Sequence, residues 1–167
     1  MVRDAEPDDA AAIAEVRIRS WQGAYAHVFS AERLASLDER REQEARHWRA
    51  AIESPPLPAH MLLAERGDEA IGFASIGQER EDPSAGQVYA IYVVPEACGT
   101  GAGHALMQES LRRLREDGYG EGVLWVLDDN ARARTFYERE GWSLMDVMRE
   151  ETFLGTLVRE VRYRIAL

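Results

Sequence analysis

A glycine-rich turn between a buried strand and a helix constrains the fold of this chain more than any other feature. The segment 87–94, QVYAIYVV, is apolar on both faces, which is typical of a central strand covered on two sides. The segment 95–104 follows it, and the helix expected next ends at Gly118. The turn has glycine at alternate positions, namely Gly99, Gly101 and Gly103. Glycine lets the backbone approach a ligand closely, and a helix start offers free N–H groups, so the turn predicts a pyrophosphate cradle.

The same turn lacks the marks of two common nucleotide-binding loops. A dinucleotide fingerprint would need glycine where His104 stands. A Walker A loop needs a lysine, and all 20 basic residues of this chain are arginine. The absence of lysine also excludes Schiff-base chemistry and a lysine-bound pyridoxal phosphate. A tight turn that only packs a helix against the sheet remains the structural alternative.

Composition narrows the partners and the cellular setting. The net charge of −10 repels phosphate backbones and suits amine-bearing ligands, so no nucleic-acid partner is expected. One cysteine, Cys98, cannot form a disulfide within the chain, and four scattered histidines predict no metal site. No apolar run approaches the ~20 residues that span a bilayer, so we expect a cytoplasmic protein with no membrane partner. The length suits a single domain over residues 1–167.

The hydrophobic periodicity predicts strands and helices along the whole chain. After a short first strand, one helix leads towards Trp21 and Tyr25, and a second runs from Ser30 to the prolines at 55–58. The elements expected after these are a hairpin of strands 60–66 and 70–78, a strand 87–94, a helix to 118, a strand 123–127, a helix 128–140 and two closing strands. Together they predict a mixed α/β sheet flanked by helices.

Two motifs in matching context resemble the GNAT acetyltransferase superfamily. Residues 91–107, IYVVPEACGTGAGHALM, are similar to the family's acetyl-CoA signature, Gln/Arg-x-x-Gly-x-Gly/Ala. Residues 124–142, LWVLDDNARARTFYEREGW, are similar to its strand–Asn–helix block, which ends in Phe-Tyr-Glu-x-x-Gly-aromatic. Weaker similarities to a bacterial subgroup lie at 21–25 and 160–167. The resemblance covers nearly the full chain and implies the GNAT fold, a twisted, mixed but mostly antiparallel sheet of about six or seven strands flanked by about four helices.

The resemblance also implies an enzyme, an acetyl-CoA-dependent N-acetyltransferase. The acetyl group of the co-substrate acetyl-CoA would pass to a primary amine, on a small molecule or a protein N-terminus, by direct attack in a ternary complex. A function of a different class remains open, a non-catalytic acyl-CoA-binding module that regulates a partner. Family members often form homodimers, so a homodimer is a possible assembly.

Several residues acquire roles from their match to the family's motifs. The Val93 N–H would polarise the thioester carbonyl, the backbone of Ile91 would pair with the pantetheine arm, and Tyr137 would protonate the departing thiolate. Asn130, the only asparagine in the chain, would bond the cofactor or cap its helix. Arg134 would reach the adenosine phosphates, unless it belongs only to a solvated helix face. The loop residues that would hold the pyrophosphate are Cys98, Gly99, Thr100, Gly101, Gly103 and His104.

Two positions depart from the family's pattern. Cys98 stands where the signature has Gln or Arg, so one side-chain contact to the pyrophosphate is missing and weaker cofactor binding is expected. Trp125 stands where some members carry a catalytic glutamate, five residues before Asn130. The general base must therefore come from elsewhere in the chain or from water.

No motif identifies the acceptor site. Trp21 and Tyr25, one helical turn apart, would wall an acceptor pocket or pack helix against helix. Tyr92 and Glu79 are further candidates for binding the amine. Charged residues near a turn, such as Glu79, are more often simply solvated.

Overall fold

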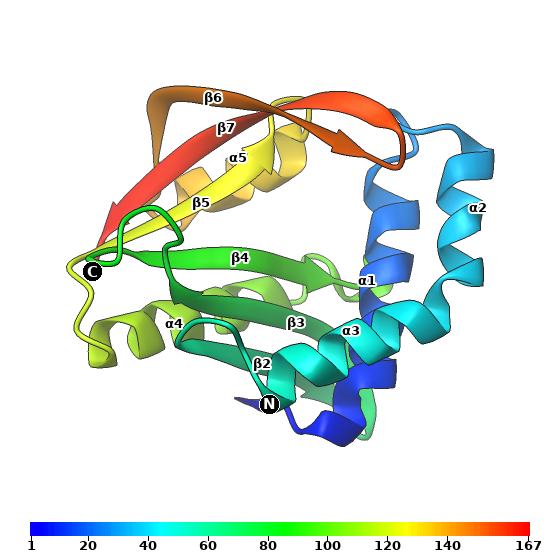
Figure 1. The fold of residues 1–167 in the computed structure, drawn as a ribbon, viewed down its shortest axis with the longest axis horizontal. Coiled ribbons are helices and arrows are strands. Elements are labelled where there is room, and N and C mark those ends of the chain that lie inside the picture. The colour runs from blue at the N-terminus through cyan, green and yellow to red at the C-terminus, as the bar shows by residue number, and fades with distance from the viewer.

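A seven-stranded sheet of order β1–β2–β3–β4–β5–β7–β6 runs through the computed structural model, which describes residues 1–167 (Figure 1). All neighbouring strands are antiparallel except β4 and β5, which are parallel. The mixed, mostly antiparallel sheet expected from the sequence is therefore confirmed. The strands are β1 (Val2–Asp4), β2 (Ala59–Arg66), β3 (Glu69–Gln78), β4 (Gly86–Val93), β5 (Glu121–Leu127), β6 (Ser143–Phe153) and β7 (Thr156–Ala166).

Five α-helices accompany the sheet, one more than expected. The single helix predicted before the proline cluster is two helices that meet at Arg40. Leu37 of the first packs in a cluster with Trp21, whereas Trp48 of the second enters the main core. The turn at Arg40 changes the direction of the chain between these two packing sites. The helices are α1 (Ala10–Ala24), α2 (Ala31–Glu39), α3 (Arg41–Glu53), α4 (Ala102–Glu116) and α5 (Ala131–Arg139). None of these helices combines the length and apolar content that a membrane span requires.

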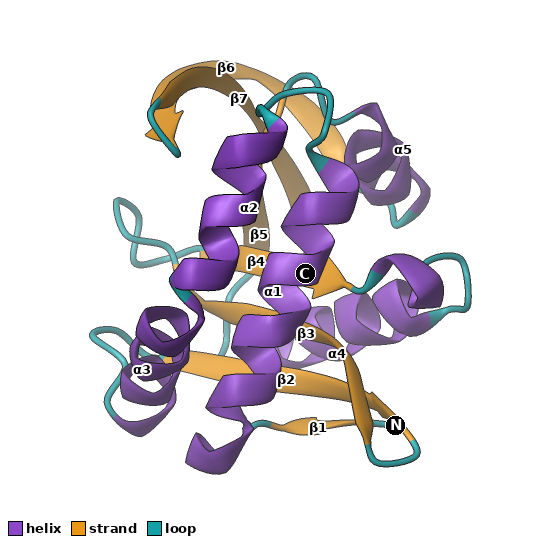
Figure 2. Cartoon of the chain, turned by 90° about the vertical axis from the view of Figure 1, so that its right-hand side faces the viewer, coloured by secondary structure: helices purple, strands orange, loops and turns teal.

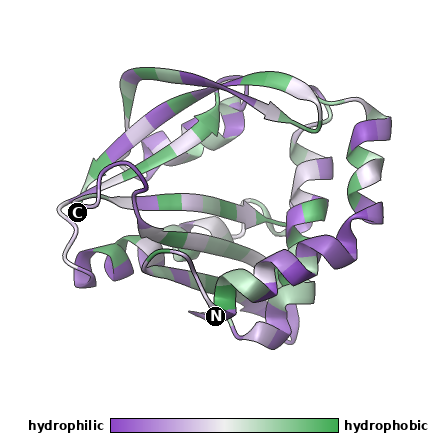
Figure 3. Cartoon of the chain, in the orientation of Figure 1, coloured by the Kyte–Doolittle hydropathy of each residue, from purple (hydrophilic) through white to green (hydrophobic).

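The helices form two layers around the sheet, with α1, α2 and α3 on one side and α4 and α5 on the other (Figure 2). Hydrophobic and hydrophilic residues alternate along the second half of β7 (Figure 3), so this strand presents different side chains to the two layers. On β7, Val161 and Tyr163 enter the main core of 27 residues. Val158, on the opposite face, joins a smaller cluster of eight residues with Trp21 and Tyr25 of the α1 layer.

The parallel strands β4 and β5 pair only at their first residues. Their register joins Gly86–Val88 to Gly122–Leu124, and beyond this point the two strands diverge (Figure 1). β4 keeps its other partner, β3, up to Val93. Ligands of open α/β sheets commonly bind outside the carboxyl ends of such strands, where neighbouring connections leave in different directions.

The divergence leaves backbone groups of β4 without a strand to bond. The Val94 N–H donates to the Ile71 carbonyl at 3.0 Å, and Val93 lies opposite Gly72. The N–H groups along an antiparallel strand alternate between its two sides. Those of Ile91 and Val93 therefore point away from β3, towards the space that opens between β4 and β5.

Candidate active site

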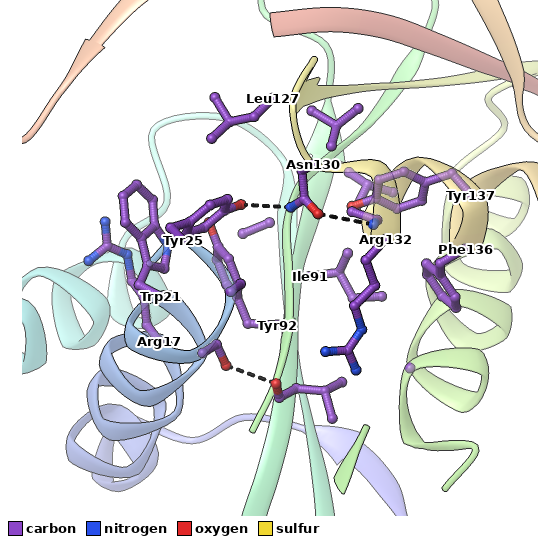
Figure 4. A pocket seen from close by; sticks show the side chains of 18 of the residues that line it. Arg17, Trp21, Tyr25, Ile91, Tyr92, Leu127, Asn130, Arg132, Phe136 and Tyr137 are labelled. Carbon is purple, nitrogen blue, oxygen red and sulfur yellow. Dashed lines mark hydrogen bonds between the residues drawn. The ribbon is translucent and has the colours of Figure 1, made fainter. Parts of the chain in front are cut away.

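A cavity of about 1210 Å³ occupies the space where β4 and β5 diverge (Figure 4). Residues of α1 and α3 line it on one side, residues of α4 and α5 on the other, and both diverging strands contribute. The cavity brings together most of the residues that the sequence indicated, namely Trp21, Tyr25, Ile91, Tyr92, Val93, Cys98, Gly99, Gly101, Gly103, His104, Asn130 and Tyr137. It therefore connects the glycine-rich turn to the aromatic residues of α1.

The glycine-rich turn supplies a row of free backbone amides. Gly99 and Gly101 have φ of 79° and 93°, a left-handed conformation that residues with a side chain rarely adopt. The amides that have no hydrogen-bond partner within the chain are those of Gly99, Gly101, Ala102, Gly103 and His104. The dipole of a 15-residue helix adds positive potential at the same end. The turn can therefore hold a pyrophosphate without a cationic side chain, which fits the coenzyme A moiety.

Val93 is held at the end of β4 by a side chain from α1. Its carbonyl accepts a hydrogen bond from Ser20 Oγ at 3.0 Å, and Ser20 is buried. The Val93 N–H lies on the same side of the strand and faces the diverging space. It can donate to an oxygen atom on which negative charge develops.

Tyr137 of α5 is buried beside the cavity. Its ring packs against the rings of Trp142 and Tyr163, with centroids 6.4 and 6.2 Å away. Burial raises the pKa of the Tyr137 hydroxyl above its usual range, and the nearby Tyr92 adds to the rise. The hydroxyl therefore keeps its proton at neutral pH and is available as a donor to an atom on which negative charge develops, such as the sulfur of a departing thiolate.

Asn130 connects the two sides of the cavity. Its Oδ1 accepts a hydrogen bond from the Ala133 N–H at 3.1 Å, so Asn130 caps α5, as one of its two predicted roles required. Its Nδ2 donates to the Tyr25 hydroxyl at 3.2 Å (Figure 4). This second contact, from α5 to α1, was not predicted.

Two residues expected to contact the cofactor lie outside the cavity and use their side chains elsewhere. Arg134 donates to Asp128 Oδ1 at 2.6 Å and to the Tyr163 hydroxyl at 3.2 Å, so it braces α5 against the sheet. Thr100 Oγ1 donates to the Ala97 carbonyl at 2.7 Å and stabilises the turn from within. Both side chains are therefore already engaged by other groups of the chain.

Glu79, expected near the acceptor, also lies outside the cavity. Its buried carboxylate accepts hydrogen bonds from the backbone amides of Glu81 and Asp82, so it holds the β3–β4 turn together. The alternative expectation of a solvated side chain is also wrong, because the Glu79 side chain is buried inside the turn. The carboxylates that do line the cavity are those of Glu44, Glu140 and Glu160.

Two ion pairs that line the cavity on the side facing α1 were not predicted from the sequence. Arg17 pairs with Glu44 at 3.0 Å, and Arg149 pairs with Glu160 at 2.7 Å. The guanidinium of Arg149 lies 4.3 Å from the ring centroid of Trp125, the residue that replaces the family's glutamate. The partners in each pair come from different elements, so the sequence did not predict the pairs. The alternation along the last strand indicated only that Glu160 points away from the core face of that strand.

Comparison with a protein family agrees with this geometry. The profile described as the acetyltransferase (GNAT) family matches residues 16–142. The chain belongs to the GNAT acetyltransferase family. It is therefore an acetyl-CoA-dependent acetyltransferase, with acetyl-CoA as co-substrate.

Individual relatives carry related names. The chain is 29% identical over 131 residues to the uncharacterized N-acetyltransferase YuaI of Bacillus subtilis (strain 168), a match that covers 77% of this chain and 72% of that protein. It is 33% identical over 123 residues to the mycothiol acetyltransferase of Parafrankia sp. (strain EAN1pec), covering 64% of this chain and only 36% of that longer protein.

Solved structures show the same fold. The PaiA N-acetyltransferase of Thermoplasma acidophilum, in complex with coenzyme A, superposes with a TM-score of 0.79 at 21% identity, over 100% of this chain and 98% of that one. The YncA protein of Salmonella typhimurium, with its cofactor acetyl-CoA, superposes with a TM-score of 0.68 at 19% identity, over 99% of this chain and 92% of that one.

Proposed function

We propose that this GNAT enzyme transfers the acetyl group of acetyl-CoA to a primary amine in a single complex that holds both substrates. The observation that supports this best is the continuity of one cavity. The free amides at the start of α4, the Val93 N–H and Tyr137 all border it, together with the aromatic side chains of α1. An acceptor bound on the α1 side would lie across the divergence from the cofactor.

Each element of the cavity has a part in this proposal. The free amides of α4 would bind the pyrophosphate, and the unpaired backbone of Ile91 would bond the pantetheine arm as an added strand does. Bound acetyl-CoA supplies the activated acyl group. The Val93 N–H would stabilise the negative charge that develops on the carbonyl oxygen, a contribution of about 3 kcal/mol. Tyr137 would give its proton to the departing thiolate.

A cationic amine suits the charge of the chain as an acceptor. The net charge of −10 attracts cations towards the protein and disfavours anionic acceptors. An ammonium group on a small molecule and the N-terminus of a protein both meet this condition. Either must lose a proton before the nitrogen can attack a carbonyl carbon.

The cofactor part of the proposal is tested by the melting temperature with and without acetyl-CoA. Ligand at about 100 times its dissociation constant stabilises the folded state by about 2.7 kcal/mol, so a clear rise is expected. Gly101→Val should remove the rise, because φ of 93° is strained for valine and the free amides would move. Gly118→Val is the matched control, since Gly118 has φ of 91° at the other end of α4. Both variants should melt lower, but only Gly101→Val should lose the response to acetyl-CoA.

The catalytic part is tested by thiol release from acetyl-CoA against polyamines, amino acids, aminoglycosides and peptides with free N-termini. Amine-dependent release supports the proposal. A protein that acetyl-CoA stabilises but that releases no thiol with any amine is instead the non-catalytic acyl-CoA-binding module. A wild-type protein that saturating acetyl-CoA does not stabilise contradicts both functions.

A further inference from the structure

Glu160 is the most buried carboxylate of the cavity on its α1 side. The residue is only 7% exposed. Of the other two cavity carboxylates, Glu140 bonds His104 at the α4 side, 2.8 Å away, and Glu44 pairs with Arg17 of α1. Since buried charges are costly unless they are paired, the partners of Glu160 indicate what it does.

The register of the sheet places Glu160 at the carboxyl end of β5. It lies opposite Leu127, the last residue of β5. Directly opposed residues share a face of the sheet, and Leu127 packs with Trp21 in the cluster of the α1 layer. Because β4 and β5 are parallel, Val93 ends β4 at the same edge. Glu160 therefore lies on the acceptor face, at the edge where the Val93 N–H would hold the acyl carbonyl.

Arg149 occupies only one of the two oxygens of Glu160. Its Nε and Nη2 both lie 2.7 Å from Oε2. The same guanidinium stacks on Trp125, which fixes its position. Oε1 accepts no hydrogen bond from the chain. Oε1 is therefore free to accept a hydrogen bond, and a ligand that brings an N–H donor into the cavity would complete this site.

The surroundings of Glu160 are largely aromatic, and the nearby charges are arginines. Besides Arg149, the guanidinium of Arg162 lies 5.6 Å from the Trp125 ring centroid and that of Arg17 lies 4.8 Å from the Trp21 ring centroid. Burial, and to a smaller extent the negative charge of Glu160, raise the pKa of both Tyr25 and Tyr92, so these hydroxyls stay neutral. In Figure 4 the rings of Trp21, Tyr25 and Tyr92 gather beside Leu127, across Asn130 from Tyr137. The apolar part of the wall consists of Trp21, Trp125, Leu127 and Phe153. Such a wall suits the apolar body of a ligand whose cationic end reaches Oε1.

We propose that Glu160 binds the ammonium group of the acceptor and removes its proton, and that the acceptor is a primary amine on an apolar body, such as an arylalkylamine. The proposal rests on amine acetylation as the function. Arg149 is then a positioning residue, because it holds Oε2 and leaves Oε1 to the substrate. This supplies the base that Trp125 cannot supply.

The proton transfers balance as follows. R–NH₃⁺ gives one proton to Glu160, and the lone pair of R–NH₂ attacks the thioester carbonyl carbon. The C–S bond breaks and the thiolate takes the proton of the Tyr137 hydroxyl, which regains a proton from the nitrogen as the amide forms. R–NH₃⁺ and the acetyl thioester thus yield the amide, the thiol and one proton, which Glu160 returns to water.

Binding to the protein loaded with coenzyme A tests the proposal without turnover. The probes are 2-phenylethylamine and its uncharged analogue 2-phenylethanol, titrated by calorimetry at saturating coenzyme A. Wild-type protein should bind the amine about tenfold or more tightly than the alcohol, and Glu160→Gln should lower only the amine affinity, by about tenfold or more. Glu151→Gln is the matched control, because Glu151 lies 3.9 Å from the same Arg149 but outside the cavity.

Kinetics separate a role in the reaction from a role in folding. With 2-phenylethylamine, Glu160→Gln should lower kcat/KM for the amine about 100-fold or more and leave KM for acetyl-CoA unchanged. Glu160→Asp keeps the charge and should retain part of the preference for the amine. Melting curves show whether each variant keeps its fold. If Glu160→Gln does not fold, the amine preference of Glu160→Asp still tests whether Glu160 binds the ammonium group.

The outcomes distinguish this inference from the function on which it rests. If coenzyme A does not bind, the proposed function fails. If it binds but wild-type protein does not prefer the amine, or Glu160→Gln prefers it equally, only the present inference is overturned. If Glu44→Gln loses the preference for the amine over the alcohol and Glu160→Gln keeps it, the ammonium group binds Glu44 of the Arg17–Glu44 pair. That result would also overturn the present inference.

Discussion

The side-chain amide of Asn130 donates a hydrogen bond to the Tyr25 hydroxyl at 3.2 Å, and this contact ties the start of α5 to the end of α1. The two residues are 105 positions apart in the sequence, and both line the cavity. Because Asn130 Oδ1 is engaged by the Ala133 N–H, the orientation of its amide group is fixed and only Nδ2 can face Tyr25. One side chain thus caps α5 and joins the α1 side of the cavity to the α5 side.

The first prediction is that these two functions of Asn130 separate in a double-mutant cycle. Asn130→Ala removes both the cap and the contact to Tyr25 and should lower the free energy of unfolding by about 1–2 kcal/mol. Tyr25→Phe removes only the contact and should cost about 1 kcal/mol. The double variant should cost less than the sum, because the shared bond is counted twice. Urea unfolding measures all three, and strict additivity would show that the bond contributes nothing.

The parts of the site that sequence analysis could predict are those encoded within one turn or one helix. Gly101 contributes to the cradle because its turn joins a strand to a helix, and the strand, turn and helix are consecutive in the sequence. Asn130 stands at a helix start, where its type alone suggests a cap. Tyr137 was expected from its match to the family's Phe-Tyr-Glu-x-x-Gly-aromatic block on that same helix. Local rules and motif spacing reach each of these without knowledge of the tertiary structure.

The parts that could not be predicted depend on which strands lie side by side. Glu160 enters the cavity because β7 pairs with β5 in a register that sets it opposite Leu127. Arg134 leaves it because Asp128 and Tyr163 lie within reach of its guanidinium. A shift of one residue in that pairing would reverse both faces. Nothing local to these residues records the register.

A second prediction concerns Tyr137, whose hydroxyl has no hydrogen-bond partner in the chain. Tyr137→Phe should lower kcat about 100-fold, leave acetyl-CoA affinity nearly unchanged and change the melting temperature little. Tyr163→Phe should leave kcat nearly unchanged but lower the free energy of unfolding by about 1 kcal/mol. The reason is that the Tyr163 hydroxyl bonds Arg134 and Glu138 outside the cavity. Thiol-release kinetics and calorimetry with coenzyme A measure the two effects. An unchanged kcat in Tyr137→Phe would require another proton donor.

A third prediction concerns Cys98, which lines the cavity beside the free amides. Its thiol donates to the Val94 carbonyl at 3.4 Å and its N–H to the Pro95 carbonyl at 3.2 Å, so neither group is free for a pyrophosphate. Cys98→Arg restores the residue type of the family's signature and should tighten acetyl-CoA binding about tenfold through a charge-assisted hydrogen bond. Cys98→Ser adds no charge and should bind as wild type does. Calorimetry measures both, and unchanged affinity in Cys98→Arg would mean that its side chain does not reach the phosphates.

The last prediction follows from the buried tyrosines and from the absence of lysine. Burial raises the pKa of Tyr25, Tyr92 and Tyr137 above the value of about 10 that tyrosine has in the unfolded chain. Below about pH 10 these hydroxyls are protonated in both states, so their contribution to stability is fully present. As the pH rises further, the unfolded chain releases protons that the folded chain retains, and the free energy of unfolding falls by about 1.4 kcal/mol per pH unit for each such group until the folded pKa is reached.

Urea unfolding at several pH values from about 8 to about 11 measures this slope. With no lysine in the chain, tyrosines are the main groups that titrate at the alkaline end, so the slope can be assigned to them. Tyr137→Phe should reduce this slope by about 1.4 kcal/mol per pH unit, the contribution of one tyrosine, and leave the free energy of unfolding near pH 8 almost unchanged. An equal slope in the variant would mean that Tyr137 ionises as readily in the folded enzyme as in the unfolded chain, and such a hydroxyl could not be held protonated by its burial.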